Sequence, residues 1–255
     1  MRSDALLALA GLGAILALWE VLPRVGVFEP SLVPPFSEVV ASYGELFTER
    51  RLLSNAFASI QRNVLGYLAA VVVAVPLGLA LGALPQVRHA MLPWVGALRF
   101  VPLAALTGFF IANFGIGEDM KVLFLAFGVG VYLVPTTVQR FDEVPASYVQ
   151  AAQTMGASRW EVFRRVQLPV VLSRVFDDLR VLTAIGWTYI VLAESLAVSP
   201  GVAPGLGRLA YVLARTNTAG VYAVLIVITA IGLAQDRLFA LADRALFPHK
   251  HVSAH

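Results

Sequence analysis

The chain has 255 residues, of which 58% are hydrophobic and only 14% are charged. Soluble domains carry about 25% charged residues, so this composition excludes a water-exposed globular domain and predicts a membrane protein. The formal net charge of +3 does not indicate a nucleic-acid partner, and the absence of cysteine excludes disulfides, thiolate catalysis and cysteine-ligated metals.

A membrane span needs about 20 apolar residues, so the length allows about six spans. The first is predicted at residues 5–22, which resemble a signal peptide but lack a small-residue cleavage site before Pro23 and Arg24. We therefore expect an uncleaved anchor. Residues 24–57 are more polar, and a short helix around Ser37–Phe47 is expected in the interface on the outer side.

The second and third spans follow closely. Val64–Leu84 contains no charged residue and predicts a span, and a turn at Pro85–His89 is expected to lead into a third span near Met91–Ile111. Arg99 and Pro102 interrupt that third span. A fourth span is expected at Val122–Val138 and a fifth at Leu179–Val198, followed by a Gly/Pro-rich loop at Ser199–Gly207. A sixth span is expected at Thr218–Gln235, continuing at most toward Phe247, and Pro248–His255 is expected to be a polar tail.

The orientation of these spans follows from lysine and arginine. With six spans, most of these residues fall on the side that holds both termini and the loops after the second and fourth spans. Because cytoplasmic loops carry the excess of positive charge, both termini are predicted to be cytoplasmic.

The one long amphipathic segment is Pro145–Pro169, with the sequence PASYVQAAQTMGASRWEVFRRVQLP. Pro145 suits the first turn of a helix, and Gly156 can adopt the left-handed conformation that ends one. Ser158 and Glu161 have the spacing of a capping box, which starts a second helix. Leu168 precedes a proline, so that helix is predicted to stop there.

This segment resembles the EAA loop, the signature of bacterial ABC-importer permeases. Seven residues fall in register with it, although Gln150 replaces its glutamate and Val166 its isoleucine: Gln150, Ala151, Ala152, Gly156, Val166, Leu168 and Pro169. The resemblance covers roughly residues 30–245 and is closest to the branch that imports sulfonates, taurine, nitrate or bicarbonate, and related pyrimidine compounds. The looser matches are LVPPFSEVV, SIQRNVLGYLAA, FGIGE, the Trp187–Glu194 stretch and Gly205–Gly207.

The resemblance implies an all-α membrane protein with six transmembrane helices, the type I ABC-importer permease fold and a cytoplasmic coupling-helix loop. It divides the chain into a first helix with an outer interfacial segment at 1–57, a transmembrane domain at 58–245 with the coupling element at 142–169, and a cytoplasmic tail at 246–255. The coupling element is expected to dock on the ATPase subunit through eleven residues: Gln150, Ala151, Ala152, Met155, Gly156, Ala157, Trp160, Phe163, Val166, Leu168 and Pro169.

The implied function is that of a permease subunit in the bacterial inner membrane, importing a small anionic solute such as a sulfonate, nitrate or bicarbonate. Its implied partners are a second permease copy, two ABC ATPase subunits and an external substrate-binding protein. The chain contains no G-x-x-x-x-G-K-[ST] motif, so ATP and magnesium would be bound by the ATPase, and the chain itself is not expected to be an enzyme.

Alternatives stay open for several of these residues. The amphipathic segment could instead lie on the membrane surface, as arginine-rich helices often do. Trp160 and Phe163 could pack on the protein's own helices. A six-helix secondary transporter driven by an ion gradient is the alternative function, and it would need intramembrane carboxylates or broken helices.

Five residues are candidates for the substrate pathway: Arg99, Asn113, Trp187, Tyr189 and Glu194. Ionisable residues within a membrane usually face a cavity or a partner, so Arg99 could meet an anion, or it could extend to the interface. Glu194 could equally be paired for structural reasons, and Trp and Tyr are also common interfacial anchors. A metal site at His249, His251 and His255 is not expected, since no carboxylate lies among them.

Overall fold

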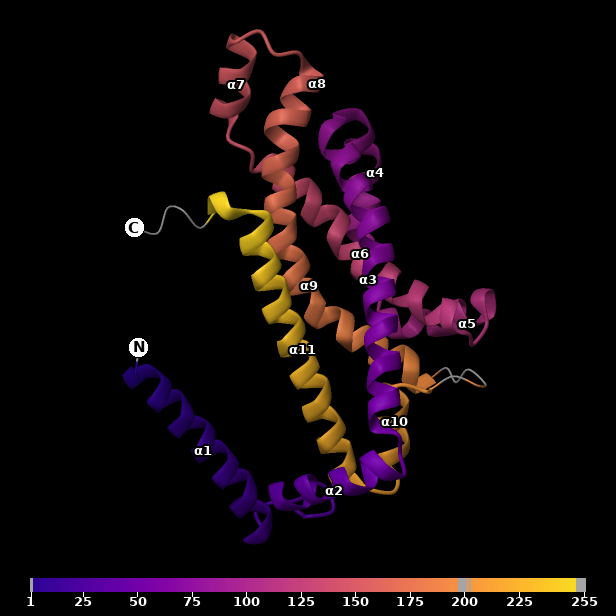
Figure 1. Cartoon of the computed structure of the whole chain (residues 1–255). Helices are drawn as coiled ribbons and strands as arrows, with labels where there is room; N and C mark the ends of the chain where they lie inside the picture. The colour runs from indigo at the N-terminus through magenta and orange to yellow at the C-terminus, as the bar shows by residue number, and fades with distance from the viewer. Residues whose placement is uncertain (1, 197–200, 202, 251–255) are drawn as a thin grey trace.

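The computed structural model describes residues 2–196, 201 and 203–250, and all regular secondary structure in this part of the chain is helical (Figure 1). The elements are α1 Arg2–Arg24, α2 Phe36–Thr48, α3 Leu52–Ala83, α4 Pro85–Leu98, η1 Leu103–Leu106, α5 Thr107–Phe114, α6 Glu118–Asp142, α7 Ala146–Thr154, α8 Arg159–Val162, the π-helical η2 Phe163–Gln167, α9 Leu168–Leu196, α10 Leu206–Leu213, α11 Thr218–Leu246 and η3 Pro248–Lys250.

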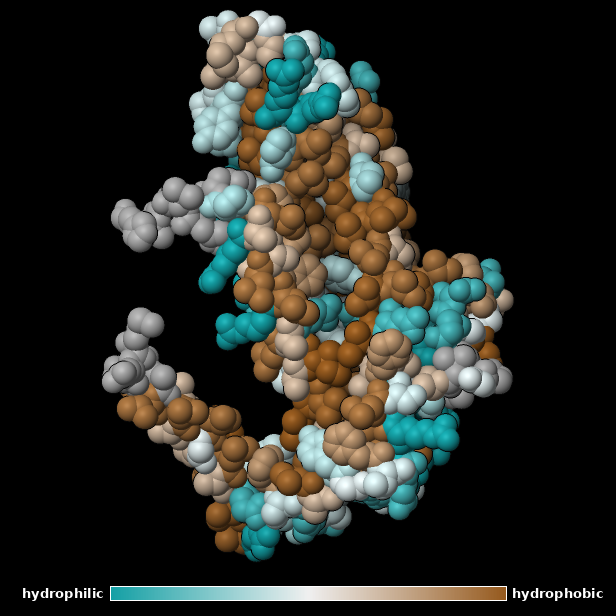
Figure 2. Space-filling model, in the orientation of Figure 1, coloured by the Kyte–Doolittle hydropathy of each residue, from teal (hydrophilic) through white to brown (hydrophobic). Residues whose placement is uncertain are grey.

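Five helices in the described chain are long and apolar enough to cross a membrane, namely α1, α3, α6, the continuous α8–α9 run and α11. The bent pair formed by α4 with η1 and α5 adds a sixth when it is counted as one span. Figure 2 shows apolar surface over the middle of the bundle and hydrophilic side chains gathered near α7 and α8. This arrangement agrees with the six spans expected from the sequence.

The centre of the bundle is formed by α3, α6 and α9, whose apolar side chains make the largest buried cluster. Gly66 and Gly78 of α3 face α6, and a Cβ on either would lie 2.5 Å from the side chain of Leu125 or Thr137, respectively. The two backbones can approach this closely only because these side chains are absent, which is the packing typical of membrane helices.

A second cluster joins α2, α10 and α11 at the end of the bundle opposite α7 and α8 (Figure 1). The short helix expected near Ser37–Phe47 is confirmed as α2. Helix α1 diverges from the bundle, and most of its apolar side chains are exposed. Trp19 attaches it through an indole that donates a hydrogen bond to the carbonyl of Pro34 at 3.0 Å and a ring 5.4 Å from Phe36, and Glu20 accepts hydrogen bonds from Ser37 of α2.

The connection between the second and third spans differs from the prediction. Leu84 alone makes the turn, and Pro85 already starts α4, since proline fits a first helical position. The predicted third span is broken into two helical segments, because α4 and the η1–α5 pair meet at 91°. Arg99 ends α4, and Pro102 adopts an extended conformation before η1 begins.

The predicted stop at Leu168 is wrong. The chain continues from α8 through η2 directly into α9. Pro169 would clash with the carbonyl four residues earlier in a regular α-helix, and the extra residue of a π turn moves that carbonyl away. The fifth helix therefore begins eleven residues before the predicted Leu179.

Helix α10 was not predicted, because the Gly/Pro-rich composition of its surroundings indicated a loop. Of the predicted fifth span and following loop, Ala197–Pro200 and Val202 lie outside the described residues. Gly205, with φ of +94°, directly precedes α10. At the other end of the chain, α11 extends to Leu246, close to the furthest extent expected for the sixth span.

Candidate functional site

The coupling element is built from local signals that the sequence displays directly. Helix α7 starts after Pro145, and Gly156 has a φ of +85°, a conformation that glycine adopts without strain. The Ser158 hydroxyl accepts from the backbone N–H of Glu161, whose carboxylate accepts from the Ser158 N–H, forming the predicted capping box. The helix–bend–helix projects beyond the bundle as a free end (Figure 1).

This element presents an apolar tip. Met155 and Trp160 are 82% and 65% exposed, although both are large and apolar. Trp160 stacks on Phe163 at 5.5 Å, and Phe163 in turn lies 6.4 Å from the ring of Phe141 in α6. Phe163 thus packs partly on the protein's own helices, while Trp160 faces outward.

The other residues expected to dock are distributed over the same element. Ala152 is buried. Three positions are partly buried, namely Ala157, Val166 and Leu168, and four are exposed, namely Gln150, Ala151, Gly156 and Pro169. The exposed arginines Arg159, Arg164 and Arg165 surround the aromatic pair in sequence. An aromatic anchor within a charged rim is the composition of a protein-binding surface.

A cluster of charges holds the base of the coupling element. Arg140 of α6 donates to Glu143 at 2.8 Å and to Asp178 of α9 at 2.7 Å. Arg174 of α9 donates to the backbone carbonyl of Glu143 at 3.0 Å. The hydrogen bonds from Arg140 hold the pKa of the Glu143 carboxyl below its ordinary value. We call these four residues the base clamp, and it fastens the coupling element to α6 and α9.

The five pathway candidates do not converge. Asn113 is exposed at the end of α5 and donates to the carbonyl of Phe109. Trp187 is buried and donates to Gln235 of α11 at 2.8 Å, and Tyr189 is half-buried against Gly128 of α6. Glu194 is fully buried and reaches no open surface in this conformation.

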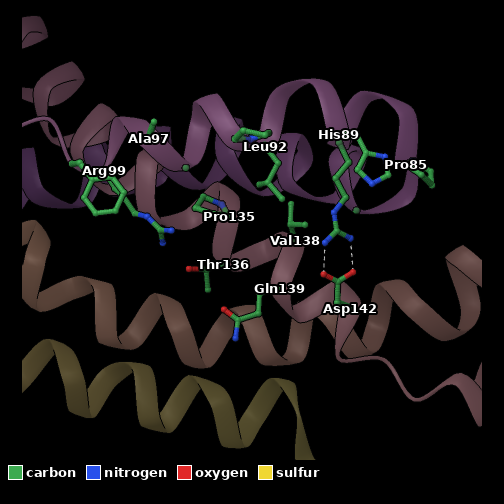
Figure 3. Close-up of a pocket in the computed structure, with 15 residues that line it drawn as sticks. Pro85, His89, Leu92, Ala97, Arg99, Pro135, Thr136, Val138, Gln139 and Asp142 are labelled. Carbon is green, nitrogen blue, oxygen red and sulfur yellow. Dashed lines mark hydrogen bonds and ion pairs between the residues drawn. The ribbon is translucent and has the colours of Figure 1, made fainter.

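Of the five, Arg99 lines a pocket that has a volume of about 760 Å³ and lies between α4 and α6. Figure 3 shows Arg99 at one end of this space and Asp142 at the other, with Thr136 and Gln139 of α6 between them. Arg88 pairs with Asp142 through two contacts of 2.5 Å.

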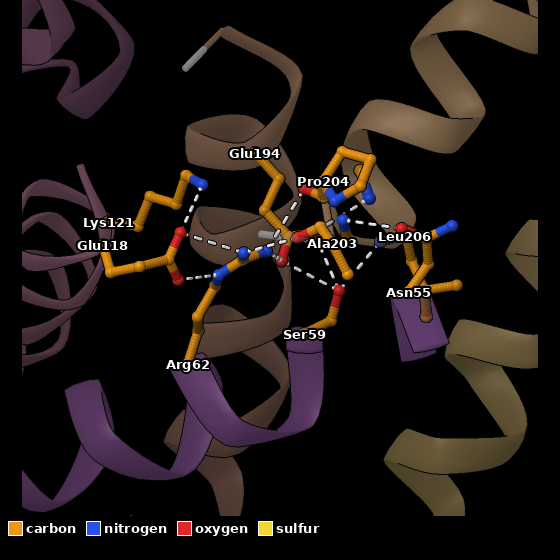
Figure 4. Close-up of polar contacts among 11 residues, drawn as sticks. Asn55, Ser59, Arg62, Glu118, Lys121, Glu194, Ala203, Pro204 and Leu206 are labelled. Atoms are coloured by element: carbon orange, nitrogen blue, oxygen red, sulfur yellow. Dashed lines mark hydrogen bonds and ion pairs between the residues drawn. The ribbon is translucent and has the colours of Figure 1, made fainter. Parts of the chain in front are cut away.

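Glu194 belongs to a buried ionic network near the end of the bundle opposite the coupling element. Arg62 of α3 contacts Glu194 of α9 at 2.7 Å and forms a two-point ion pair with Glu118 of α6, which also pairs with Lys121 at 2.8 Å (Figure 4). The side chains of Arg62 and Glu194 are only 3% and 0% exposed. Glu118 is 37% exposed, and its carboxylate and that of Glu194 balance the charges of the buried Arg62 and Lys121.

The network also holds the start of α10. Arg62 donates to the carbonyls of Ala203 and Pro204 at 2.7 and 3.2 Å, so each of its guanidinium nitrogens has a partner. The first backbone N–H groups of a helix have no partner within the helix. Here Gly205, Leu206 and Gly207 donate theirs to Asn55, Ser59 and Glu194, respectively.

Sequence reasoning missed both charge clusters. Arg62 was not among the residues singled out from the sequence, and Glu194 was considered without its charge partner. The available signal was that an intramembrane arginine and an intramembrane glutamate, on different spans, each needed an opposite charge. For the expected histidine tail, His251 and His255 and the side chain of His249 lie outside the described residues.

A multi-pass helical bundle with a projecting helix–bend–helix and a broken span defines the class of membrane transport permeases. Comparison with known families makes this specific. The chain belongs to the family of binding-protein-dependent transport system inner membrane components, which it matches over residues 54–248. The resemblance drawn from the EAA-like segment is thereby confirmed.

Two relatives and one solved structure illustrate the relationship. The chain is 29% identical to the taurine transport system permease protein TauC of Escherichia coli, over 77% of this chain and 73% of that protein. It is 24% identical to the bicarbonate transport system permease protein CmpB of a Synechocystis species, over 97% and 90%, respectively. Other relatives are named for aliphatic sulfonates and nitrate.

The fold is also that of a solved transporter. A chain of the MetNI methionine ABC transporter, in an inward-facing conformation, superposes with a TM-score of 0.67 at 17% identity, covering 76% of this chain and 95% of that one. This likeness confirms the type I ABC-importer permease fold predicted from the sequence.

Proposed function

We propose that this chain is the membrane-spanning subunit of an ATP-driven importer and that two copies form the translocation pathway. Each copy would dock a cytoplasmic ABC ATPase, and an external binding protein would deliver the solute. ATP and magnesium would be bound by the ATPase, which leaves this chain the role of a transport subunit. Both termini and the coupling element would face the cytoplasm.

The observation that carries the proposal is the projecting coupling element. Met155 and Trp160 lie exposed at its tip, although their burial would be favourable by about 1.5–3 kcal/mol for a side chain of this size. An element that extends beyond the bundle and keeps such side chains in solvent is suited to a soluble partner on that side of the membrane.

The base clamp connects the coupling element rigidly to the transmembrane helices. Arg140 and Arg174 fasten Glu143 to two central helices, so a displacement of the coupling element would be passed to α6 and α9 rather than absorbed in a hinge. Closure of two ATPases on ATP would bring two such elements together and turn the bundles outward. ATP must favour one state over the other for this movement to occur.

The solute is proposed to be a small anion, such as a sulfonate, nitrate or bicarbonate. Support comes from the printed names of the relatives, which include taurine, aliphatic sulfonates, nitrate and bicarbonate. The exposed Arg99 between α4 and α6 supports the same class of solute.

The proposal is tested by purifying the tagged chain in mild detergent and identifying stoichiometric partners. We expect an ATPase with a P-loop to co-purify, and to be lost in Gly156→Asp. Gly156 has open space where a Cβ would stand, so the substitution adds charge to the docking surface without a steric clash, although its φ of +85° strains the backbone for any residue other than glycine.

Gly26→Asp is the matched control. Gly26 has a φ of +78°, close to the +85° of Gly156, and it also has open space around its Cβ position, but it lies between α1 and α2. It should keep the ATPase. Equal retention by both variants would refute docking at Gly156. Uptake that responds to an uncoupler but not to ATP depletion would favour the gradient-driven transporter instead.

A further inference from the structure

The pocket between α4 and α6 contains one arginine without a counter-ion. Arg99 makes no hydrogen bond or ion pair with any residue that the structure describes, and its guanidinium lies 5.5 Å from the ring of Phe100. It stands where α4 ends and the chain bends by 91°. A cation within a membrane span is costly unless it faces a cavity or a partner.

The other charges of the pocket cancel. Arg88 and Asp142 form a two-point ion pair, which neutralises that end of the pocket. Arg99 is eleven residues further along than Arg88, or about 16 Å at the rise of an α-helix. The pocket therefore carries a net positive charge that is concentrated at its Arg99 end, with the neutral pair at the other.

The rest of the lining suits an anion with a short organic part. The hydroxyl of Thr136 makes no hydrogen bond to the described residues and is free to donate. Leu92, Phe100 and Pro135 supply apolar surface nearby. A guanidinium binds an oxyanion through two parallel N–H groups, and the volume of about 760 Å³ is far more than a bare inorganic anion needs.

We propose that this pocket binds the transported solute, with Arg99 as counter-ion and Thr136 as hydrogen-bond donor, and that it prefers an aliphatic sulfonate over a small inorganic anion. The inference rests on the proposed function, since it places the solute of that importer in a particular site. It adds a location, a charge partner and a preference for an organic tail.

The chain suits a thiol-labelling test because it contains no cysteine. Gly96 lines the pocket, and a Cβ there would meet nothing within 4 Å, so Gly96→Cys places a lone thiol in the site without a clash. The complete transporter in nanodiscs is labelled with two methanethiosulfonates of similar size, one carrying a sulfonate and one a trimethylammonium group. The measured quantity is the ratio of the two labelling rates.

With Arg99 in place the sulfonate reagent should be favoured, and Arg99→Gln should lower the rate ratio about tenfold. Arg99→Lys keeps the charge and should keep most of the ratio. The double variant Arg88→Gln with Asp142→Asn removes the neutral pair and leaves the net charge unchanged, so its ratio should equal that of the parent. An unchanged ratio in Arg99→Gln would overturn the proposal.

Ligand protection tests the preference. Ethanesulfonate should slow labelling of Gly96→Cys at lower concentration than nitrate does, and Arg99→Gln should weaken this protection about tenfold. Protection by neither anion, or stronger protection by nitrate, would overturn the assigned solute class. Slowing that requires phosphatidylglycerol in the nanodisc, and is absent in pure phosphatidylcholine, would assign the pocket to a lipid headgroup and also overturn it.

The two proposals fail differently. If the parent protein shows no ATP-dependent uptake and no ATPase partner, the proposed function fails regardless of the labelling. If the parent takes up ethanesulfonate with ATP and Arg99→Gln does so with unchanged KM, only the pocket assignment fails. Retention of the co-purifying ATPase in Arg99→Gln confirms that any uptake defect arises at the pocket.

Discussion

The guanidinium of Arg62 lies 2.7 Å from the carboxylate of Glu194, and both side chains are almost completely buried. The two residues are 132 positions apart and join α3 to α9. Through Gly207 and the carbonyl of Ala203, the same pair fixes the start of α10. One ionic contact thus determines the position of three segments at the end of the bundle opposite the coupling element.

The destabilising effects of removing the two partners of this pair should not be additive. Glu194→Gln leaves the buried guanidinium of Arg62 without one of its two carboxylate partners. Breaking a buried pair in this way costs about 3–5 kcal/mol. The double variant Glu194→Gln with Arg62→Gln should be destabilised by less than the sum of the single variants. Thermal unfolding in detergent measures the coupling, and strictly additive losses would contradict it.

Gly207→Ala should prevent α10 from seating on α9. A Cβ at Gly207 would lie 2.3 Å from the backbone oxygen of Val191, and a backbone atom cannot move aside as a flexible side chain can. We expect low yields of folded protein in fluorescence-detected size-exclusion chromatography. Gly13→Ala, where a Cβ meets nothing within 4 Å, is the control and should behave like the parent.

Loss of the capping box should loosen the coupling element locally. Ser158→Ala removes the side-chain acceptor for the Glu161 N–H, and such caps are worth about 1 kcal/mol. Hydrogen–deuterium exchange should become faster in Arg159–Val162 and remain unchanged in α6. Ser147→Ala replaces an exposed serine of the same element and should change neither, so equal effects of both variants would exclude the cap as the cause.

Trp160→Ala should weaken ATPase binding without destabilising the permease. The indole is 65% exposed, so little packing within the chain is lost, whereas truncating an aromatic interface anchor costs about 2 kcal/mol or more. The measurement is the affinity of the purified permease for its ATPase. Trp94→Ala is the control, because Trp94 is 76% exposed on α4, outside the coupling element. Wild-type affinity in Trp160→Ala would remove this residue from the docking surface.

The base clamp should respond to acid but not to mild alkali. The pKa of Glu143 is lowered in the folded state, chiefly by hydrogen bonds from Arg140, so its stabilising contribution is complete above the ordinary carboxyl range. It is lost as the pH falls through the lowered value. Amide exchange in residues 143–148 should therefore be insensitive to protonation of Glu143 between pH 6 and 8, after correction for the intrinsic rate.

Glu143→Gln imitates the protonated carboxyl at neutral pH. It should accelerate exchange at the base of the coupling element, and it should reduce ATP-driven uptake while the ATPase still binds. Glu38→Gln, on α2 far from the clamp in sequence, serves as the control for loss of one carboxylate. Unaltered exchange and uptake in Glu143→Gln would show that the clamp does not transmit motion.

The sequence by itself determined what depends on near neighbours. The composition predicted a membrane protein, and uninterrupted apolar runs predicted the spans. Within lipid the backbone N–H and C=O groups must be hydrogen-bonded inside the protein, as they are in a helix. The start of α7, the left-handed Gly156 and the capping box were all predictable, since each interaction closes within three or four residues. The prediction of a helix end before Pro169 was wrong, because a π turn at Phe163–Gln167 lets the helix continue through the proline.

Only the tertiary structure decided which distant side chains meet. The 91° bend after α4, the existence of α10 and the pairing of Arg62 with Glu194 all depend on helices brought together from distant positions in the chain. A buried charge signals that a partner exists, but its identity depends on how α3, α6 and α9 pack. That packing is fixed by close contacts such as Gly66 against Leu125, whose partners are not encoded in either local segment.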